Sequence, residues 1–439
     1  MKFYSTNNTA PVADLRKAVV KGLAEDRGLY MPEKIKTLPQ EFFDEIGSMT
    51  FHDIACTVAD AFFGEDIDRD ALHDIVRDTL SFDCPVVEVS NHIYALELFH
   101  GPTLAFKDVG GRFMARLLQH IYKGERTGGN GDNKLVNVLV ATSGDTGSAV
   151  ANGFLGVEGI HVYVLYPKGK VSPIQECQFT TLGQNITAIE VDGVFDDCQR
   201  LVKSAFMDAE LTSALCLTSA NSINVARFLP QSFYYFNALA QMRRRGITDD
   251  IVFCVPSGNF GNICAGLFAR RMGLPVSRFI AANNANDVFF QYLQTGEYRP
   301  RPSVATIANA MDVGDPSNFA RILDLYGKSH EAICKDISGV AYSDSEIADT
   351  IREVFSKTGY VCDPHGACGY RALSEKLQDG EVGIFLETAH PAKFKDTIDE
   401  ILAADITIPD RLQAFMRGEK QSIGLSKEFA DFKAFLLNR

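Results

Sequence analysis

Short apolar runs alternate with helical patterns along most of the chain. From residue 92 onward, apolar residues recur every three or four positions in the segments that follow runs such as "HIYALEL", "KLVNVLVA", "IHVYVLY", "ITAIEV", "DIVFCV" and "RFIAA". Apolar runs of this length are typical of parallel strands that helices cover on both faces. The pattern therefore predicts an α/β fold with two doubly wound, mainly parallel sheets.

The first 90 residues follow a different pattern. Helix-compatible segments such as "PVADLRKAVVKGLA" lie there between Gly and Pro breaks, which predicts a helical N-terminal domain over residues 1–90. We expect residues 91–105 and 225–410 to form a large α/β domain, residues 106–224 a small α/β domain, and residues 411–439 a C-terminal tail. The looser stretch 284–318 predicts a long excursion at the site or between domains.

Composition narrows the function classes. A chain of 439 residues with 46% hydrophobic content has the size of a multidomain globular enzyme. A net charge of −13 without a basic cluster argues against a nucleic-acid or anionic-membrane partner. The N-terminus has no apolar export segment, and no run of 18 apolar residues follows. We therefore expect a cytoplasmic protein.

The ten cysteines form no CxxC pair, and Cys216 and Cys254 lie in apolar runs, as buried thiols do in a reducing compartment. One segment, "CDPHGAC", resembles a metal site through Cys362, His365 and Cys368. It lacks a fourth nearby ligand and a recognised zinc spacing. We interpret it as a loop that opens a helix and expect no metal.

One lysine stands at the start of an apolar helix. In "ELFHGPTLAFKDVGGRFMARLLQHI", the helical pattern begins near residues 103–107, so Lys107 lies in or just before the first turn. The positive end of the helix dipole and apolar neighbours disfavour an ammonium there and favour the free amine of nucleophilic chemistry. The alternative is a lysine stem on an apolar surface, with its charge paired to Asp108.

A glycine-rich loop has the form of a phosphate cradle. In "VPSGNFGN", Gly258 and Gly261 let the backbone approach an anion, while helix N-terminal amides, Asn259 and Asn262 offer donors. The loop has neither the GK[ST] of a Walker A motif nor GxGxxG, which disfavours nucleoside triphosphates and dinucleotides. A glycine-rich turn without a ligand is the alternative.

Two further polar loops follow strands, where doubly wound folds bind ligands. "ATSGDTGSA" carries Ser143, Asp145 and Thr146. "TSANSINVAR" carries Asn221, Ser222 and Arg227, a set suited to a phosphate or carboxylate. Helix capping is the alternative for both loops. Taken with a free lysine amine and a phosphate cradle, they predict pyridoxal 5'-phosphate, which carries both an aldehyde and a phosphate.

The motifs "HGPTLAFKD", "ATSGDTG", "SANSIN", "PSGNFGN" and "TAHPAKF", in this order and after "GLAEDRGLYMP", resemble the longer threonine synthases of bacteria and fungi. The resemblance spans nearly the whole chain. It implies a fold-type II pyridoxal-phosphate enzyme whose large domain binds the cofactor. The implied reaction is the last step of threonine biosynthesis, in which O-phospho-L-homoserine and water give L-threonine and phosphate.

The resemblance also implies roles for individual residues. Lys107 would be the Schiff-base lysine and the proton carrier, Asp145 would lie beside the cofactor's phenolic oxygen, and Thr388 would face its pyridine nitrogen. The cofactor phosphate would bind Gly258, Asn259, Phe260, Gly261 and Asn262. The substrate O-phosphohomoserine would bind Ser143, Thr146, Asn221, Ser222 and Arg227.

Two alternatives to this function stay open. One is a phospho-lyase that releases 2-oxobutyrate and ammonia from the same substrate. The other is a cofactor-binding protein without catalysis, which the presence of Lys107 together with the substrate-phosphate set argues against. For the assembly we expect a monomer or a homodimer.

Overall fold

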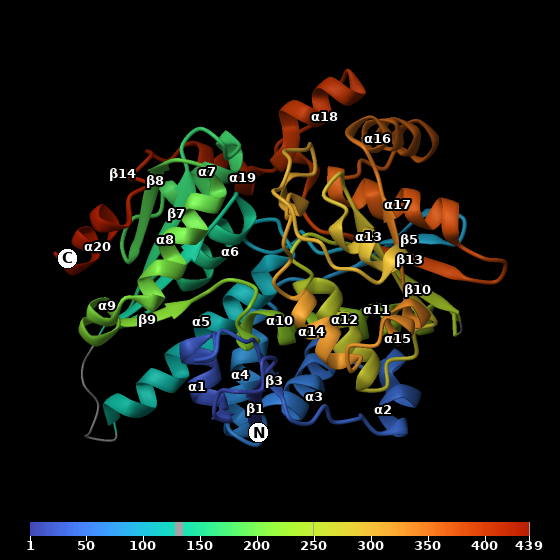
Figure 1. Ribbon diagram of the computed structural model, residues 1–439. Coiled ribbons are helices and arrows are strands. Elements are labelled where there is room, and N and C mark those ends of the chain that lie inside the picture. Colours follow the sequence, from blue (N-terminus) through green and yellow to red (C-terminus); the bar gives the residue numbers. More distant parts are fainter. Residues whose placement is uncertain (128–134, 249, 439) are drawn as a thin grey trace.

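Two open sheets organise the computed structural model, which describes residues 1–127, 135–248 and 250–438 (Figure 1). The larger sheet has the strand order β12-β11-β10-β13-β5-β4 and the smaller has β14-β8-β7-β6-β9. The large-sheet strands are β4 (Val86–Ser90), β5 (Ile93–Glu97), β10 (Ile251–Pro256), β11 (Arg278–Asn283), β12 (Ile337–Ala341) and β13 (Val382–Glu387). The small-sheet strands are β6 (Val136–Ala141), β7 (Ile160–Pro167), β8 (Ile186–Asp192), β9 (Cys216–Ser219) and β14 (Ser422–Ser426).

Helices fill the connections and cover the sheets. Those before and within the small-sheet region are α1 (Leu15–Lys21), α2 (Gln40–Glu45), α3 (Phe51–Phe63), α4 (Arg69–Thr79), α5 (Lys107–Thr127), α6 (Asp145–Phe154), α7 (Pro173–Thr180), α8 (Phe195–Met207) and α9 (Ala209–Ala214). Those that follow are α10 (Val225–Phe228), α11 (Ser232–Arg244), α12 (Gly261–Arg271), α13 (Val288–Thr295), α14 (Phe319–Leu325), α15 (His330–Asp336), α16 (Asp344–Thr358), α17 (Pro364–Lys376), α18 (Lys395–Leu402), α19 (Asp410–Met416) and α20 (Phe429–Leu437). Short 3₁₀ turns are η1 (Ile46–Ser48), η2 (Leu229–Gln231), η3 (Asn309–Met311) and η4 (Pro391–Phe394).

The strand pairing confirms the predicted fold class. All pairs in the small sheet are parallel, and in the large sheet only the β4–β5 pair is antiparallel. The central strands β6, β10 and β13 are buried along their whole length, as their continuous apolar runs predict. Because parallel strands end at the same sheet edge, the loops after β10 and β13 emerge side by side, as do those after β6 and β9.

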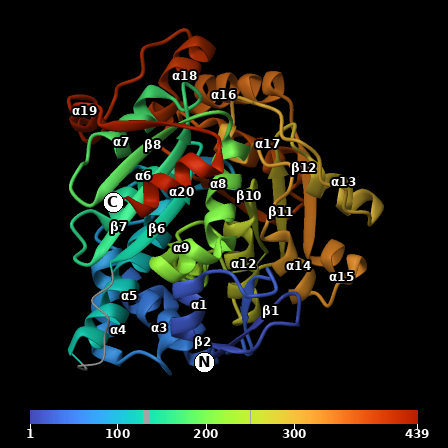
Figure 2. The same cartoon turned by 60° about the vertical axis from the view of Figure 1, so that its left-hand side comes forward.

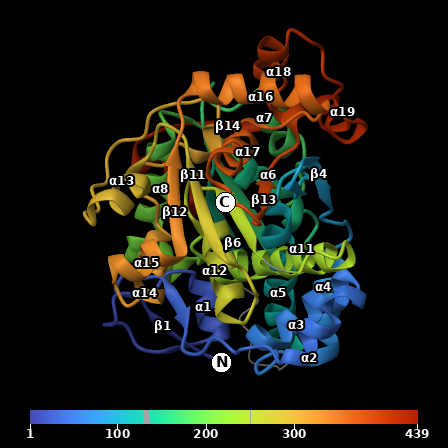
Figure 3. The ribbon, with the colours of Figure 1, turned by 90° about the vertical axis from the view of Figure 1, so that its right-hand side faces the viewer.

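Two predicted segments need correction. Residues 1–90 contain helices but also an antiparallel sheet of β1 (Lys2–Ser5), β2 (Ala13–Asp14) and β3 (Tyr30–Pro32), and they end in β4 of the large sheet. These strands are too short to show a clear period in the sequence. Figure 3 shows this N-terminal region beneath α5 and α11.

The predicted C-terminal tail is built into the small sheet instead. Its strand β14 pairs in parallel with β8, and α20 packs on α8 (Figure 2). A strand from the end of the chain therefore forms one edge of the small sheet. Both ends of the chain thus add strands to the sheets, β4 to the large sheet and β14 to the small sheet, and the domain boundaries stay a prediction.

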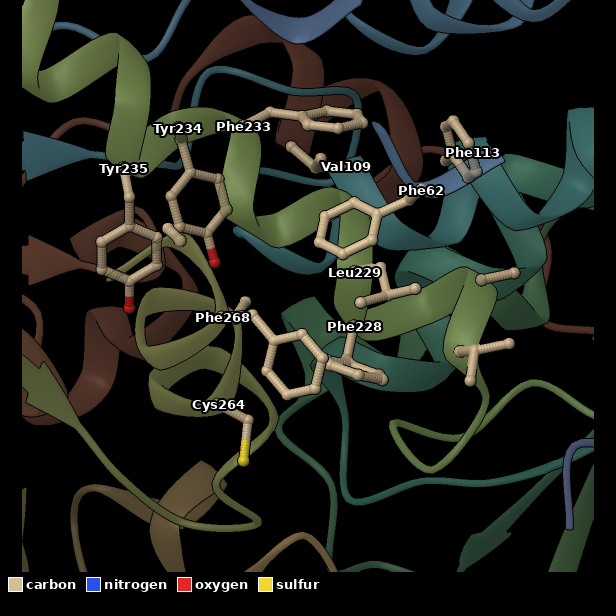
Figure 4. Close-up of a cluster of buried hydrophobic side chains, with 14 of the residues drawn as sticks. Phe62, Val109, Phe113, Phe228, Leu229, Phe233, Tyr234, Tyr235, Cys264 and Phe268 are labelled. Atoms are coloured by element: carbon tan, nitrogen blue, oxygen red, sulfur yellow. The ribbon is translucent and has the colours of Figure 1, made fainter. Parts of the chain in front are cut away.

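The main core is aromatic along α11, which is buried on every side along its first nine residues. Figure 4 shows Phe228 and Phe268 meeting there, and their ring centroids lie 5.2 Å apart in an edge-to-face pair. The helical stretch from Val225 to Arg244 is divided into α10, η2 and α11, because Pro230 has no amide hydrogen to donate. No helix among the described residues is long and apolar enough to cross a bilayer.

Candidate active site

A cavity of about 260 Å³ opens where loops from the two sheets converge. The large sheet contributes residues 256–262 and Thr388, and the small sheet contributes Ser143, Thr146, Asn221 and Ser222. Lys107 at the start of α5 and Arg227 on α10 also line it, together with residues of the 301–317 segment and of α8. The structure thus brings all the site residues expected from the sequence to one cavity, except Asp145.

Lys107 is the first residue of α5, as the apolar periodicity predicts. Close packing fixes the helix, since a side chain at Gly110 or Gly111 would collide with the carbonyls of Arg227 or Ala149. The alternative in which Lys107 pairs with Asp108 is not seen, because no ion pair joins the two among the described residues and Thr103 donates to both carboxylate oxygens of Asp108 through its amide (2.8 Å) and hydroxyl (2.6 Å).

The charge state of Lys107 follows from its surroundings. Burial, the largest effect, lowers its pKa to about 8, and the cations Lys393 and Arg227 act in the same direction while Asp145 opposes them. The Phe106 ring lies 5.5 Å from the Lys107 Nζ. Near neutral pH the amine can therefore release and accept a proton.

The glycine loop joins β10 to α12 with little room for side chains. Phe260 has a φ of 62° just before the helix, and a Cβ at Gly258 would lie 2.7 Å from the carbonyl oxygen of Ala310. A Cβ at Gly261 would lie 3.3 Å from the Cβ of Ser222. The loop is thus pressed between η3 and the 221–222 loop, with the amides of the α12 N-terminus at the cavity.

Asn262 offers an unused donor to this cavity. The hydroxyls of Tyr234 and Tyr235 donate to its Oδ1 at 2.7 and 2.8 Å, which fixes the orientation of the amide. Its Nδ2 is buried and has no hydrogen-bond partner among the described residues. A buried donor without a partner is unfavourable, so this atom fits an anion such as the phosphate of pyridoxal phosphate.

Arg227 presents a second unused donor. Its Nη1 donates to the Ala220 carbonyl, while its Nε is buried without a partner in the described chain. Burial lowers its pKa to about 10, which leaves the guanidinium charged at neutral pH. A buried cation with an unpaired N–H is well suited to an anionic ligand.

The helix-cap alternative for the polar loops is resolved by their neighbours. Asn224, rather than Asn221 or Ser222, caps α10 by accepting from the Ala226 amide at 3.0 Å. Thr142, rather than Ser143 or Thr146, accepts from the amides of Gly144 and Gly147 at 2.9 and 2.8 Å. The predicted residues are therefore not needed to cap these helices.

One contact ties the two sides of the cavity together. Asn259 on the glycine loop donates from Nδ2 to the Ser222 hydroxyl at 2.6 Å, and Asn318 donates to the same oxygen at 3.3 Å. Ser222 thus connects a small-sheet loop to the large sheet. Thr388, which directly follows β13, holds the start of α5 by accepting from the Phe106 amide at 2.9 Å.

Asp145 lies beside the cavity lining and is paired with Lys393, a residue outside the predicted site. Its Oδ1 is 2.5 Å from the Nζ of Lys393 and accepts from Gln175 at 3.0 Å. Burial alone would raise the pKa of Asp145, but the charges of Lys393 and Lys107 outweigh it and lower the pKa below its usual value. The carboxylate is therefore ionised, and the one sequence signal for Lys393 is its place in "HPAK", shortly after Thr388.

The segment "CDPHGAC" opens α17, which confirms its interpretation as a helix start. Asp363 caps the helix by accepting from the His365 amide at 2.7 Å, and its Oδ1 lies 2.5 Å from the His365 Nδ1. His365 also lines the cavity and accepts from the Ala310 amide at 3.1 Å, which the sequence alone did not indicate. Within the described ranges, no three His, Cys, Asp or Glu side chains are grouped to hold a metal ion.

The cavity contains a lysine that can lose its proton and two residues whose N–H donors have no partner among the described residues and could bind an anion. It lies between two mainly parallel sheets. This arrangement fits a pyridoxal-phosphate enzyme of fold type II. Residues 78–386 match the family described as "Pyridoxal-phosphate dependent enzyme", and pyridoxal 5'-phosphate is the cofactor. Residues 2–80 match "Threonine synthase N terminus", and residues 366–436 match "Threonine synthase, C-terminal". The chain belongs to the threonine synthase family.

Full-length relatives agree with this assignment. The chain is 43% identical to threonine synthase of Haemophilus influenzae over 437 residues, with 100% of both chains covered. It superposes on the crystal structure of Escherichia coli threonine synthase with a TM-score of 0.92, at 42% identity and with 100% of both chains covered. The pyridoxal-phosphate-bound threonine synthase of Brucella melitensis gives a TM-score of 0.92 at 34% identity, covering 100% of this chain and 99% of that one.

Proposed function

We propose that the cavity converts O-phospho-L-homoserine and water to L-threonine and phosphate. One observation carries this assignment: Asn262 and Arg227 both line the cavity of Lys107, and each has a buried side-chain donor, Nδ2 and Nε respectively, without a partner in the described chain. A reaction with one phosphate on the cofactor and another on the substrate uses both donors.

The large-sheet side is assigned to the cofactor. The α12 amides and Asn262 would hold its phosphate, and the Thr388 hydroxyl would face its ring nitrogen. Bound pyridoxal phosphate supplies an electron sink for charge that develops on the substrate carbons. Lys107 is assigned as the residue that attaches the cofactor.

Lys107 is also assigned as the proton carrier. With a pKa of about 8, its amine is basic enough to accept a proton from a substrate carbon and acidic enough to return it near neutral pH. No carboxylate of the described chain forms an ion pair with Lys107, so its amine is not held by a fixed counter-charge.

The small-sheet side is assigned to the substrate phosphate. Arg227 supplies a fixed positive charge, and Asn221, Ser222 and Thr146 supply neutral hydrogen-bonding groups around it. Such groups stabilise charge that accumulates on a departing phosphate. Ser143, at the same loop, is assigned to the remainder of the substrate.

The test is a product balance. Purified protein supplied with O-phospho-L-homoserine should release threonine and inorganic phosphate in equal amounts. Formation of 2-oxobutyrate and ammonia in place of threonine would establish the phospho-lyase activity instead.

We also infer a cytoplasmic location, since all ten cysteines are free thiols and most are buried in apolar surroundings.

A further inference from the structure

Lys393 is a buried lysine that the proposed reaction does not use. It lies in η4, five residues beyond Thr388, and its side chain is 0% exposed. Its Nζ lies 2.5 Å from the Asp145 Oδ1 and donates to the Thr103 carbonyl at 2.9 Å. A buried ammonium is costly unless it is paired in this way, so its presence beside the cavity calls for a chemical reason.

We propose that Lys393 is a positioning residue that acts as the fixed counter-charge of Asp145, so that this carboxylate neither holds a proton on Lys107 nor repels the phenolic oxygen of the bound cofactor. The inference rests on the proposed role of Lys107 and on the place beside the cofactor's phenolic oxygen that the family resemblance implies for Asp145. It assigns a task to a residue outside the cavity lining.

The two carboxylates near Lys107, those of Asp108 and Asp145, are hydrogen-bonded to residues other than Lys107. Thr103 engages both oxygens of Asp108, and its carbonyl in turn accepts from Lys393. Lys393 and Gln175 both meet Asp145 at Oδ1. One connected set of hydrogen bonds therefore supplies both carboxylates with partners other than Lys107.

The charges around Lys107 come from three different elements. Asp145 on α6 favours its ammonium form, whereas Lys393 in η4 and Arg227 on α10 favour the free amine. Removal of Lys393 deletes one cation and also leaves Asp145 without its ion-pair partner. Both changes strengthen the hold of Asp145 on a proton at Lys107, because an opposite charge nearby favours the charged form.

The chemistry at the phenolic oxygen leads to the same assignment. A carboxylate beside an oxygen that carries negative charge would repel it, since like charges at short range are unfavourable. Lys393 neutralises the carboxylate through its contact with Oδ1. The pair can then remain next to the cofactor as a neutral unit with a fixed dipole.

The test measures the Lys107 amine directly in the full-length chain after removal of the cofactor. Trace acetylation at a series of pH values, followed by mass spectrometry of the peptide that contains Lys107, reports the fraction of free amine. The exposed Lys335 serves as an internal reference. In the parent chain, half-maximal labelling of Lys107 is expected near pH 8.

Lys393→Met should slow labelling of Lys107 at pH 7 by about tenfold, equivalent to a shift of one pH unit. The double variant Asp145→Asn with Lys393→Met removes both charges and should return the rate to within about threefold of the parent. Lys395→Met is the matched control, because Lys395 is two residues away but pairs with Asp399 at 2.6 Å near the surface. This control should leave the profile unchanged.

An unchanged labelling profile in Lys393→Met would overturn the inference, even if the variant melts at a lower temperature, since a purely structural lysine would lower only the melting temperature. If Lys393→Met does not fold, Asp145→Asn provides the test, and it should accelerate labelling at pH 7 because two cations then face Lys107 without an anion. Equal or slower labelling would contradict the proposal.

A separate measurement distinguishes this inference from the proposed function. Borohydride reduction of the cofactor-loaded parent chain should leave the cofactor on the peptide of Lys107. Recovery on another lysine would refute the proposed role of Lys107, whatever the labelling of Lys393→Met shows. Recovery on Lys107 with identical labelling profiles would refute only the role of Lys393.

Discussion

The two sheets build their halves of the cavity in different ways. The large sheet contributes backbone shape: Gly258 and Gly261 are pressed against neighbouring chain, and Phe260 takes a left-handed conformation before α12. The small sheet contributes side chains, such as Thr146 and Asn221, on loops that other residues cap. Substitutions should therefore act sterically on the first half and through lost hydrogen bonds or charge on the second.

The difference extends to how the polar groups are held. On the large-sheet side, Tyr234 and Tyr235 fix the amide of Asn262 from the core beneath it. On the side assigned to the substrate, Arg227 on α10 is held through its Nη1 bond to Ala220, which follows β9 of the small sheet, and its Nε is unpaired among the described groups. Both Asn262 and Arg227 thus keep one donor unpaired, but the amide of Asn262 is fixed by two hydroxyls from the core, whereas one bond to a carbonyl holds the guanidinium of Arg227.

The largest effect is expected at Lys107, which lies where the two halves meet. Lys107→Ala should abolish turnover, with kcat reduced by at least about a thousandfold, because the variant loses both the cofactor attachment and the proton carrier. The large-sheet half should still bind the cofactor non-covalently. Steady-state assays and a cofactor titration check both points, and substantial turnover would remove Lys107 from its proposed role.

The small-sheet half is tested by Arg227→Lys. A point charge replaces a planar fork, so kcat and kcat/KM for O-phospho-L-homoserine should both fall on the order of a hundredfold. Because Arg227 is assigned to the substrate, affinity for pyridoxal phosphate should stay within about twofold of the parent. A variant that loses its cofactor would place Arg227 in the wrong half.

These tests follow from features that the sequence made partly visible. Apolar periodicity predicts the parallel strands and the start of α5, because burial on both faces leaves continuous runs. It misses β14, whose residues are only partly buried or exposed and form no apolar run. The strand is specified by its pairing with β8, more than two hundred residues earlier in the chain.

The site shows the same division between local and distant information. The sequence places the polar loops at strand ends, yet it does not reveal that Thr142 and Asn224 are the capping residues beside Ser143 and Asn221. Nor does it reveal the pair of Asp145 and Lys393, which folding brings together from distant segments. Residue type and spacing predict which groups lie near the cavity, whereas tertiary contacts decide which of those groups already have a hydrogen-bond or ion-pair partner within the protein.

The steric character of the large-sheet half is tested at its glycines. A Cβ at Gly258 would lie 2.7 Å from the Ala310 carbonyl oxygen and 2.8 Å from the Met311 Cα, so Gly258→Val must displace η3 or the loop itself. We expect the Kd for pyridoxal phosphate to rise by about tenfold or more. Gly261→Val should act in the same direction, since its Cβ would lie 3.3 Å from Ser222.

The matched control is Gly424→Ala on β14, where a Cβ would meet no atom within 4 Å. Fluorescence titration with pyridoxal phosphate should give the parental Kd for this variant. If Gly258→Val also bound the cofactor with parental affinity, the loop would be a turn without a ligand, and the contrast between the halves would lose its basis.

The smallest effect concerns the turn that follows the large sheet. His390 caps η4 because its Nδ1 accepts from the Ala392 amide at 3.1 Å, which requires that nitrogen to be unprotonated. Burial, together with the nearby His100, lowers the His390 pKa from 6.5 to about 4. Above pH 6.5 the histidine is neutral in both the folded and unfolded chains, and its contribution to stability is complete.

Between pH 6.5 and 4 the unfolded chain binds the proton more readily, so the free energy of unfolding should decrease as the pH falls, by roughly 2 kcal/mol from this residue. Urea unfolding at pH 7.5 and 4.5 measures the change. His390→Asn retains a capping oxygen but does not titrate in this range, so it should show a smaller loss between the two pH values. The same loss in parent and variant would assign the acid sensitivity to other groups and leave the His390 cap without a part in it.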